Sequence, residues 1–161
     1  TEFKGFLYVG LMIVSGEPYL IEYNVRMGDP ECQTILPKLK TDFYEIVEAC
    51  VNKKLNTINI EWFDDKSICI VLCSKGYPDK FKNEIEIKNL KKMNLKENEF
   101  IFHAGTKFFN NQVLSNGWRV LNFVIRSKEF NESRNKIFEL IDRLDWKDGF
   151  FRKDIGYKVI D

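Results

Sequence analysis

The chain has 161 residues, of which 44% are hydrophobic and 14% aromatic, a composition that supports a folded core and excludes a disordered polymer. Its 25 basic and 24 acidic residues nearly cancel and are spread along the sequence, which argues against nucleic acid or an anionic membrane as a partner. No apolar run approaches the roughly 20 residues of a membrane-spanning helix, and the N-terminus lacks the layout of a signal peptide. The sequence therefore predicts a soluble, cytoplasmic globular protein.

The first third of the chain predicts a hairpin followed by two helices. Residues 5–14 and 18–25 are rich in strand-forming residues and flank a short turn, so they should pair antiparallel. A short helix should begin near Asp29, with Pro30 at its first position, and end at Pro37. A second helix over about 43–51, capped by Thr41 or Asp42, shows apolar residues at helical spacing.

The rest of the chain predicts a β-rich region with one long helix. Strands are expected at residues 67–74, 84–87, 100–104, 106–109 and 119–126, because β-formers there alternate with Gly, Pro and Asn. The helix should cover about 131–144, and a last strand is expected at 157–160. We place a domain boundary near 64, which gives an α+β chain with a small antiparallel or barrel-like second domain.

The cysteines and the single histidine do not predict a zinc site or a disulfide framework. Cys32, Cys50, Cys69 and Cys73 contain no C-x-x-C pair, so reduced thiols fit best. Cys69 and Cys73 share strand parity, but buried thiols are favoured over a soft-metal site. His103 follows apolar strand residues, and a structural role is favoured over a general base.

Near the C-terminus, Arg152 could close over a phosphorylated substrate or pair with Asp154.

Glu22, Asn24 and Arg26 form the candidate chemical site. Glu22 and Asn24 are two residues apart in the second predicted strand, so their side chains face the same side. A carboxylate beside an amide oxygen suits Mg²⁺ when water and nucleotide phosphates complete its coordination. Arg26 has the same parity and adds a planar cation suited to a phosphate, a carboxylate or an acyl phosphate. The three residues together could neutralise a phosphoryl group during its transfer.

An alternating polar strand often marks only a solvated face, and the triplet alone fits that interpretation better. The following Gly28-Asp29-Pro30-Glu31 turn favours a functional site instead. Backbone N–H groups at the start of a helix attract anions, and this helix start would lie close to the proposed metal.

The segment from Glu22 to Gln33, E-Y-N-V-R-M-G-D-P-E-C-Q, resembles the signature of phosphoribosylamine–glycine ligases, in which R-aliphatic-G-D-P-E-x-Q is fixed. Every fixed position is present. Further islands in matching order extend the resemblance over essentially the whole chain, at residues 10–12, 36–40, 74–78, 102–106 and 152–156.

This resemblance implies a ligase of the ATP-grasp class. Residues 1–64 would be the C-terminal part of its ATP-grasp domain and residues 65–161 its β-rich C-terminal domain. ATP would phosphorylate glycine, and 5-phosphoribosylamine would displace the phosphate to give glycinamide ribonucleotide, a step of purine biosynthesis.

The resemblance also assigns roles to the candidate site. Glu22 and Asn24 match the ligands of Mg²⁺ or Mn²⁺, and Arg26, which matches the segment beside the reacting phosphate, is the expected catalytic residue. The residues expected beside the substrates are Arg26, Gly28, Asp29, Pro30 and Glu31.

Two departures from the family pattern bear on function. Trp118 stands where the family usually has a second glycine in Gly-Gly-Arg-Val-Leu. The lysine-bearing lid and glycine-rich loop that hold ATP in the family are not found in the sequence, so we expect the chain to be inactive without an N-terminal half.

Two alternative functions stay open. One is an ATP-grasp carboxylase, which the G-D-P-E turn disfavours, and the other is a non-catalytic module that binds a separate ATP-binding half.

Overall fold

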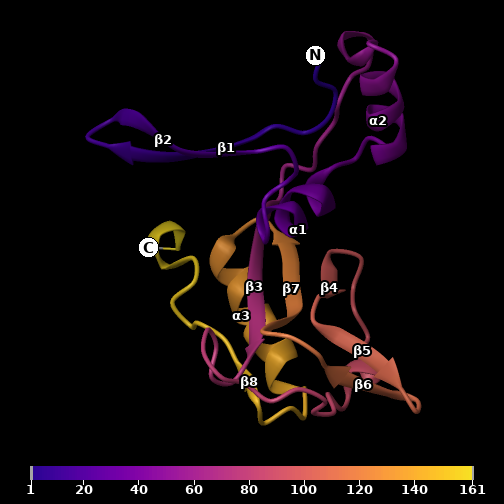
Figure 1. Ribbon diagram of the computed structural model, residues 1–161, viewed down its shortest axis with the longest axis vertical. Coiled ribbons are helices and arrows are strands. Elements are labelled where there is room, and N and C mark those ends of the chain that lie inside the picture. Colours follow the sequence, from indigo (N-terminus) through magenta and orange to yellow (C-terminus); the bar gives the residue numbers. More distant parts are fainter. Residues whose placement is uncertain (1, 161) are drawn as a thin grey trace. The chain divides into compact units, whose positions relative to one another are not determined.

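A computed structural model describes residues 2–160, which form two compact units, residues 2–63 (unit 1) and 64–160 (unit 2) (Figure 1). Each unit is described by itself. Among the described residues, no helix is both long and apolar enough to cross a bilayer.

Unit 1 begins with an antiparallel hairpin, which confirms the prediction from the sequence. Strands β1 (Tyr8–Val14) and β2 (Glu17–Asn24) are joined by a tight turn in which Ser15 and Gly16 both have positive φ, 51° and 86°. The register shifts after Gly10, where a bulge interrupts the ladder. The three residue pairs farthest from the turn, from Tyr8–Asn24 to Gly10–Glu22, keep a regular register.

Two helices follow in unit 1. Helix α1 (Glu31–Ile35) begins two residues later than predicted, because the Asp29 carboxylate accepts a hydrogen bond from Gln33 Nε2 instead of capping, and Pro30 takes the N-cap position. A 3₁₀ turn over Leu36–Lys38 contains Pro37, so the α-helix ends just before the proline. Helix α2 (Phe43–Val51) is confirmed, with the Asp42 side chain accepting from Tyr44 N at 2.7 Å.

Unit 2 is built on an open antiparallel sheet with the order β4-β7-β3-β8. Its strands are β3 (Lys66–Ser74), β4 (Glu99–His103), β7 (Arg119–Ser127) and β8 (Gly149–Phe150). A separate hairpin pairs β5 (Thr106–Phe109) with β6 (Gln112–Ser115). The predicted strands at β3, β4, β5 and β7 are confirmed, whereas β6 and β8 were not predicted.

Three expectations for unit 2 require correction. The barrel-like domain is not confirmed, since no sheet closes among the described residues and β4 and β8 remain separate edges. Residues 84–87 do not form a regular strand, although Glu86 makes an isolated bridge with Leu114 and the segment shares backbone hydrogen bonds with β6. Residues 157–160 contain a 3₁₀ turn (Tyr157–Val159) instead of a strand, because Gly156 at φ 81° starts a turn that Val159 N closes on the Gly156 carbonyl.

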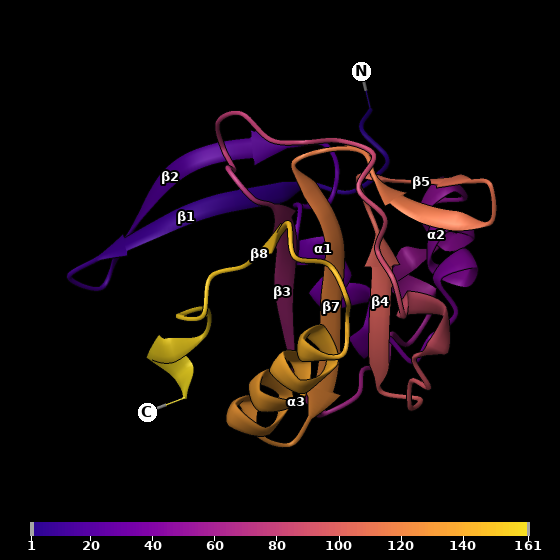
Figure 2. The ribbon, with the colours of Figure 1, turned by 90° about the horizontal axis from the view of Figure 1, so that it is seen from below.

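Helix α3 (Phe130–Asp142) covers one face of the unit 2 sheet, as Figure 2 shows, and confirms the predicted long helix. Its apolar stripe places Ile137, Leu140 and Ile141 against the strands. The sheet supplies most of the rest of this core, including Ile70, Leu72, Val120, Leu121 and Phe123, and Ile87 and Trp146 add to it from outside the strands. The hydrophobic core of unit 2 is therefore formed by its own residues.

Candidate functional site

Glu22 and Asn24 lie on one face of the β1–β2 hairpin. In the regular part of the ladder, Glu22 is paired with Gly10 and Asn24 with Tyr8. Residues two apart in a strand point to the same side, so the carboxylate and the amide are neighbours there. Glu22 is exposed and Asn24 is half-buried.

Gly10 makes room for Glu22. A Cβ atom added at Gly10 would lie 3.1 Å from Glu22 Cγ and 3.6 Å from the Tyr8 ring. A side chain at this position would therefore displace the Glu22 side chain. The contribution of Gly10 was not recognised from the sequence, although it lies in one of the islands of resemblance, because cross-strand register is not visible in a single strand.

Arg26 lies beyond the end of β2, so strand parity does not fix the direction of its side chain. Its Nη1 donates to the carbonyl oxygen of Met27 at 2.9 Å, and the residue is exposed. The guanidinium is thus held close to the chain just after the strand that carries Glu22 and Asn24.

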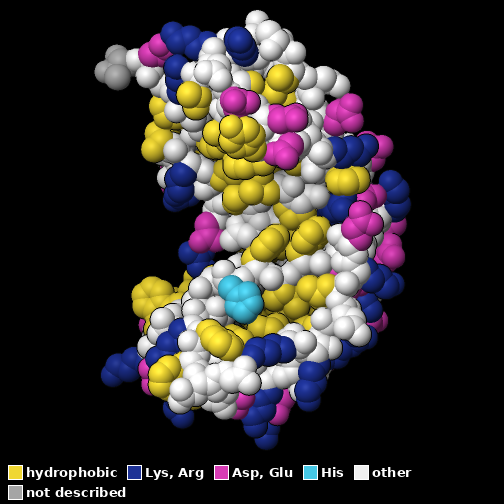
Figure 3. Space-filling model, turned by 90° about the vertical axis from the view of Figure 1, so that its right-hand side faces the viewer, with side chains coloured by type: hydrophobic (Ala, Val, Ile, Leu, Met, Phe, Trp, Pro, Cys, Tyr) yellow, Lys and Arg dark blue, Asp and Glu magenta, His cyan; other side chains and the backbone are white. Residues whose placement is uncertain are grey.

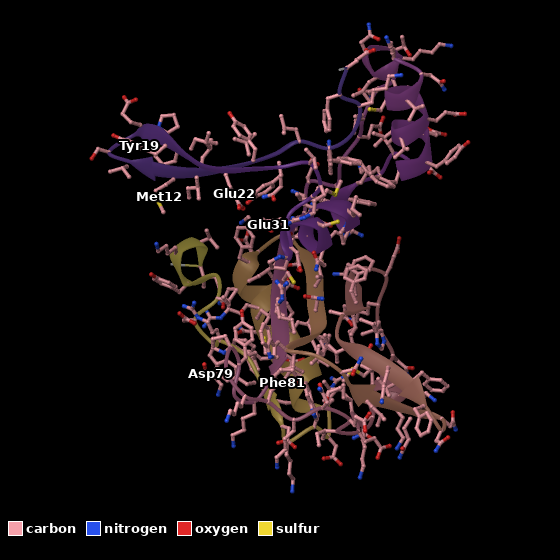
Figure 4. The ribbon with its side chains drawn as sticks, viewed as in Figure 1. Met12, Tyr19, Glu22, Glu31, Asp79 and Phe81 are labelled. Atoms are coloured by element: carbon pink, nitrogen blue, oxygen red, sulfur yellow. The ribbon has the colours of Figure 1, made fainter. Side chains whose placement is uncertain are left out.

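Gly28 and Glu31 are packed against each other in the following turn. Gly28 is buried, and a Cβ atom added to it would lie 2.9 Å from Glu31 Cδ and 3.1 Å from the Tyr8 ring. Only a glycine lets the Glu31 carboxylate lie over the backbone here. In Figure 4, Glu22 and Glu31 lie on the same side of the hairpin. The turn thus brings a second carboxylate to the face with Glu22.

The start of α1 offers less to an anion than the sequence suggested. The helix has only five residues, and Cys32 N already donates to the Gly28 carbonyl at 2.9 Å. Because the helix dipole sums over aligned peptide units, so short a helix supplies a small field. Burial raises the pKa of the Cys32 thiol at the start of this helix, and the negative charge of Asp29 raises it further.

Gln33 adds an acceptor that was not among the predicted site residues. Its Nε2 donates to Asp29 Oδ1 at 3.0 Å, which fixes the orientation of the amide. Its Oε1 is buried and has no hydrogen-bond donor among the described residues. A buried acceptor usually has a partner, so this oxygen is a candidate to receive a donor from a ligand. The signal in the sequence was the fixed glutamine of the signature.

The donor set fits a hard divalent cation that shares its coordination with other groups. Glu22 and Asn24 provide a carboxylate and an amide oxygen on one face, the oxygen ligands that Mg²⁺ and Mn²⁺ accept. No group of three or more His, Cys, Asp or Glu residues suitable for a metal occurs within residues 2–160. A cation at this face would therefore need ligands in addition to these groups, as water and phosphate oxygens provide in nucleotide sites.

The other candidate residues have ordinary surroundings. The four cysteines are thiols that form no disulfide, and burial raises the pKa of the Cys73 thiol. His103 is exposed on unit 2, where Figure 3 shows it in cyan, and its Nδ1 lies 2.9 Å from Thr106 Oγ1. Arg152 Nε donates to Asp154 Oδ1 at 3.0 Å; this ion pair raises the pKa of Arg152 and lowers that of Asp154. The sequence left open whether Arg152 closes over a phosphorylated substrate or pairs with Asp154, and the structure contains the pair with Asp154.

Two family models match the chain. The model described as "Phosphoribosylglycinamide synthetase, C domain" matches residues 67–158, which lie in unit 2. The model described as "Phosphoribosylglycinamide synthetase, ATP-grasp (A) domain" matches residues 1–32, which include the hairpin and the turn with Glu31.

Known proteins match over nearly the whole chain. The "Phosphoribosylamine--glycine ligase" of Caldanaerobacter subterraneus subsp. tengcongensis is 40% identical over 96% of this chain and 36% of its own length. The "Trifunctional purine biosynthetic protein adenosine-3" of Gallus gallus is 38% identical over 98% of this chain and 16% of its own length. The crystal structure of the Thermotoga maritima phosphoribosylamine–glycine ligase superposes with a TM-score of 0.76 and 32% identity, over 92% of this chain and 36% of that one.

The hairpin that carries Glu22 and Asn24 lies within the stretch that matches the model of an ATP-grasp domain. Together with the match of unit 2, this makes the chain a member of the phosphoribosylglycinamide synthetase family. It spans 36% of the length of the bacterial ligase that matches it at 40% identity.

Proposed function

We propose that the chain acts as part of an ATP-dependent phosphoribosylamine–glycine ligase, which forms glycinamide ribonucleotide from 5-phosphoribosylamine, glycine and ATP through glycyl phosphate. The single observation that carries this proposal is the pairing of Glu22 with Gly10 and of Asn24 with Tyr8, which puts two oxygen donors on one face of the hairpin. Residues 1–64 would belong to the ATP-grasp domain and residues 65–161 to the C-domain, in line with the two family matches. The cytoplasmic location expected from the sequence is part of the same proposal.

In this proposal the chain's own residues bind and orient the reacting groups. Glu22 and Asn24 would hold Mg²⁺ or Mn²⁺, which when bound supplies positive charge beside the phosphates of ATP. Arg26, just beyond the strand, would neutralise the phosphoryl group and the glycine carboxylate as they approach each other. The protein's contribution is then alignment and charge neutralisation, without a covalent bond to the chain.

The turn from Gly28 to Glu31 would position substrates. The packing of Glu31 over Gly28 directs a carboxylate to the Glu22 side of the hairpin, where it can accept a hydrogen bond from an amine or hydroxyl group. Asp29 and Pro30 shape this turn, and the Asp29 carboxylate orients the Gln33 amide, whose buried Oε1 can accept a further donor. Recognition of amine and hydroxyl donors suits phosphoribosylamine and glycine.

In this proposal turnover would require further chain that binds ATP, because this chain covers 36% of the length of the 40%-identical ligase. We therefore expect the chain alone to bind Mg-ATP weakly and to form no product. Calorimetry with Mg-ATP tests the first expectation, and tight binding by the chain alone would contradict it.

The deciding experiment is the substitution Glu22→Gln in the complete ligase that contains this chain. The amide keeps the size of the side chain but removes its charge, so we expect turnover to fall by about 100-fold or more while folding is unchanged. Glu17→Gln is the matched control, because Glu17 is an exposed carboxylate of the same strand near the hairpin turn. The assay measures glycinamide ribonucleotide and ADP, and the far-ultraviolet circular dichroism of both variants reports folding. Full activity of the Glu22 variant would remove the metal role.

A further inference from the structure

Unit 2 contains a polar pocket with a volume of about 390 Å³. It lies where β4 begins and β7 ends, and helix α3 forms its other wall (Figure 2). Its charged lining residues are Lys96, Glu99, Glu132, Lys136 and Glu139. Every lining residue belongs to unit 2, so one compact unit forms the whole pocket.

Glu99 is the buried carboxylate of this pocket. It is paired with Ile125 of β7, and directly paired residues face the same side of a sheet. Because Ile125 belongs to the core that the sheet shares with α3, Glu99 also faces the side of α3. Glu99 is only 6% exposed. A carboxylate therefore occupies a position on the inner face of the sheet where an apolar residue is the usual choice.

The neighbours of Glu99 do not neutralise its charge. Its Oε2 accepts a hydrogen bond from the backbone N of Lys96 at 3.2 Å. Within residues 2–160, Glu99 has no ion pair. A buried charge normally has a partner of opposite charge, and a single bond from a neutral N–H group does not replace one. The turn before β4 thus accounts for one carboxylate oxygen and leaves Oε1 for a donor from outside the chain.

Helix α3 adds three charged residues to the same pocket. Glu132, Lys136 and Glu139 follow one another at helical spacing, so they share one face of the helix. Lys136 Nζ lies 2.9 Å from Glu139 Oε2, and these two charges balance each other. The charges that remain are the carboxylates of Glu99 and Glu132 and the ammonium group of Lys96. A ligand with one positive charge would make the pocket neutral.

We propose that this pocket binds a small organic cation, a primary aliphatic amine in its ammonium form, with the ammonium group on the Glu99 carboxylate. An ammonium group brings N–H donors together with a positive charge, and Glu99 lacks both. A bare metal ion fits less well, because no three acidic, cysteine or histidine side chains of residues 2–160 are grouped for one. Ile125, which also lines the pocket, offers an apolar contact to the aliphatic part.

The inference goes beyond the proposed function and does not depend on it, since none of the residues proposed for the ligase reaction lines this pocket.

Titration of the chain with n-butylamine at neutral pH, followed by ¹H–¹⁵N correlation spectra, tests the proposal. We expect saturable shifts of the amides in the turn before β4, at the end of β7 and in α3, with a dissociation constant on the order of 1 mM. Two ligands of the same length are the controls: n-butanol, which has no charge, and butyrate, which has the opposite one. Each should bind at least about tenfold more weakly. Equal binding of n-butanol or butyrate, or no saturable shift of these amides with n-butylamine, would overturn the proposal.

Point variants locate the ammonium group. Glu99→Gln keeps the shape of the side chain and removes its charge, so it should weaken binding at least about tenfold. Glu97→Gln is the matched control, because Glu97 is an exposed carboxylate of the same turn and does not line the pocket. Glu132→Gln should weaken binding only about two- to threefold, since Glu132 is exposed and its charge is screened. Unchanged affinity of the Glu99 variant would contradict the proposal.

Melting temperatures separate a ligand site from a carboxylate that only caps the turn. Without amine, Glu99→Gln should melt at the same temperature as the unchanged chain or higher, because it removes a buried charge that has no cationic partner. At about ten times the dissociation constant, n-butylamine should raise the melting temperature of the unchanged chain and of the Glu97 variant by several degrees, and leave the Glu99 variant unaffected. A Glu99 variant that melts lower, in a chain that the amine does not stabilise, would show that Glu99 serves the turn alone.

Discussion

Strands β7 and β2 have similar lengths, nine and eight residues, but very different surroundings. Seven consecutive residues of β7 are buried, whereas no residue of β2 is. The residues of β7 pack between neighbouring strands and α3, while the hairpin of unit 1 pairs only with itself. The difference shows that ladder hydrogen bonds define a strand without supplying the apolar burial that stabilises it.

The two main helices repeat the contrast. Both α2 and α3 have an apolar stripe at helical spacing. Helix α3 buries Ser133, Ile137, Leu140 and Ile141, while α2 buries only Ala49. Unit 2 is therefore stabilised by its own core, and the stability of unit 1 depends on whatever covers its apolar surface.

Amide hydrogen exchange of the chain alone should show the largest difference between the units. Amides of β7 should exchange only on global unfolding of unit 2, whereas those of β1 and β2 can exchange through local opening. For a domain stability of about 5 kcal/mol, protection in β7 should exceed that in the hairpin by roughly 10³-fold. Mass spectrometry of peptides from each strand measures this ratio. Comparable protection in both would show that unit 1 forms a stable core unaided.

Truncation of matched apolar residues should give the next largest effect. Phe123 in β7 is 0% exposed, so Phe123→Ala should lower the free energy of unfolding by about 3–5 kcal/mol. Ile13 in β1 is 60% exposed, and Ile13→Ala should change it by less than about 0.5 kcal/mol. Urea denaturation of the chain alone measures both, when far-ultraviolet circular dichroism follows the two units together and tryptophan fluorescence, which includes the buried Trp146, follows mainly unit 2. Equal losses would contradict the contrast between the units.

Two glycines should respond differently to an added methyl group. A Cβ atom at Gly105 would lie 2.7 Å from the Arg119 carbonyl oxygen and 3.0 Å from Gly117 Cα, both backbone atoms, so Gly105→Ala should cost about 1–3 kcal/mol. At Gly28 the nearest group is the flexible end of Glu31. Gly28→Ala should therefore change the stability of the chain by less than about 1 kcal/mol.

The same glycine pair tests the site through activity. In the complete ligase, Gly28→Ala should lower turnover because it moves the Glu31 carboxylate. A Gly28 variant that destabilises the chain as much as the Gly105 variant, with normal activity in the complete ligase, would show that this turn serves packing alone.

Regular elements with strong local patterns were predictable from the sequence. The hairpin, α2, α3, β3 and β7 combine clear periodicity with turn or capping residues, such as Asp42 before α2. The open sheet was not predictable, because closure depends on which edges pair, and β8 has only two residues. The 3₁₀ turn at Tyr157 was read as a strand because β-formers outweighed the turn tendency of Gly156.

The roles of the candidate site residues stay predictions, but part of their arrangement was predictable from the sequence. Strand parity alone put Glu22 and Asn24 on one face. The packing of Glu22 against Gly10 and of Glu31 over Gly28 depends on cross-strand register and on a turn, which no periodic pattern encodes. The exposure of the hairpin was also not visible, because apolar strand residues look the same in a sequence whether their cover is present or not.

The smallest expected effect concerns surface ion pairs of the two units. Hydrogen bonding to Arg152 lowers the pKa of the Asp154 carboxyl below its ordinary 3.8. The pair therefore stabilises unit 2 at pH values above the ordinary pKa, and this contribution is lost as the pH falls through the lowered one. Asp154→Asn should reduce the melting temperature slightly at neutral pH and converge with the unchanged chain in acid.

Glu2→Gln, which removes the exposed pair with Lys53 in unit 1, is the matched comparison. It should leave the melting transition unchanged at every pH, because that transition reports the core of unit 2. Added salt should shrink the Asp154 effect, since the pair is exposed and screened. A larger, pH-dependent effect of Glu2→Gln would mean that unit 1 melts together with unit 2, and its apolar surface would then be stabilised within this chain.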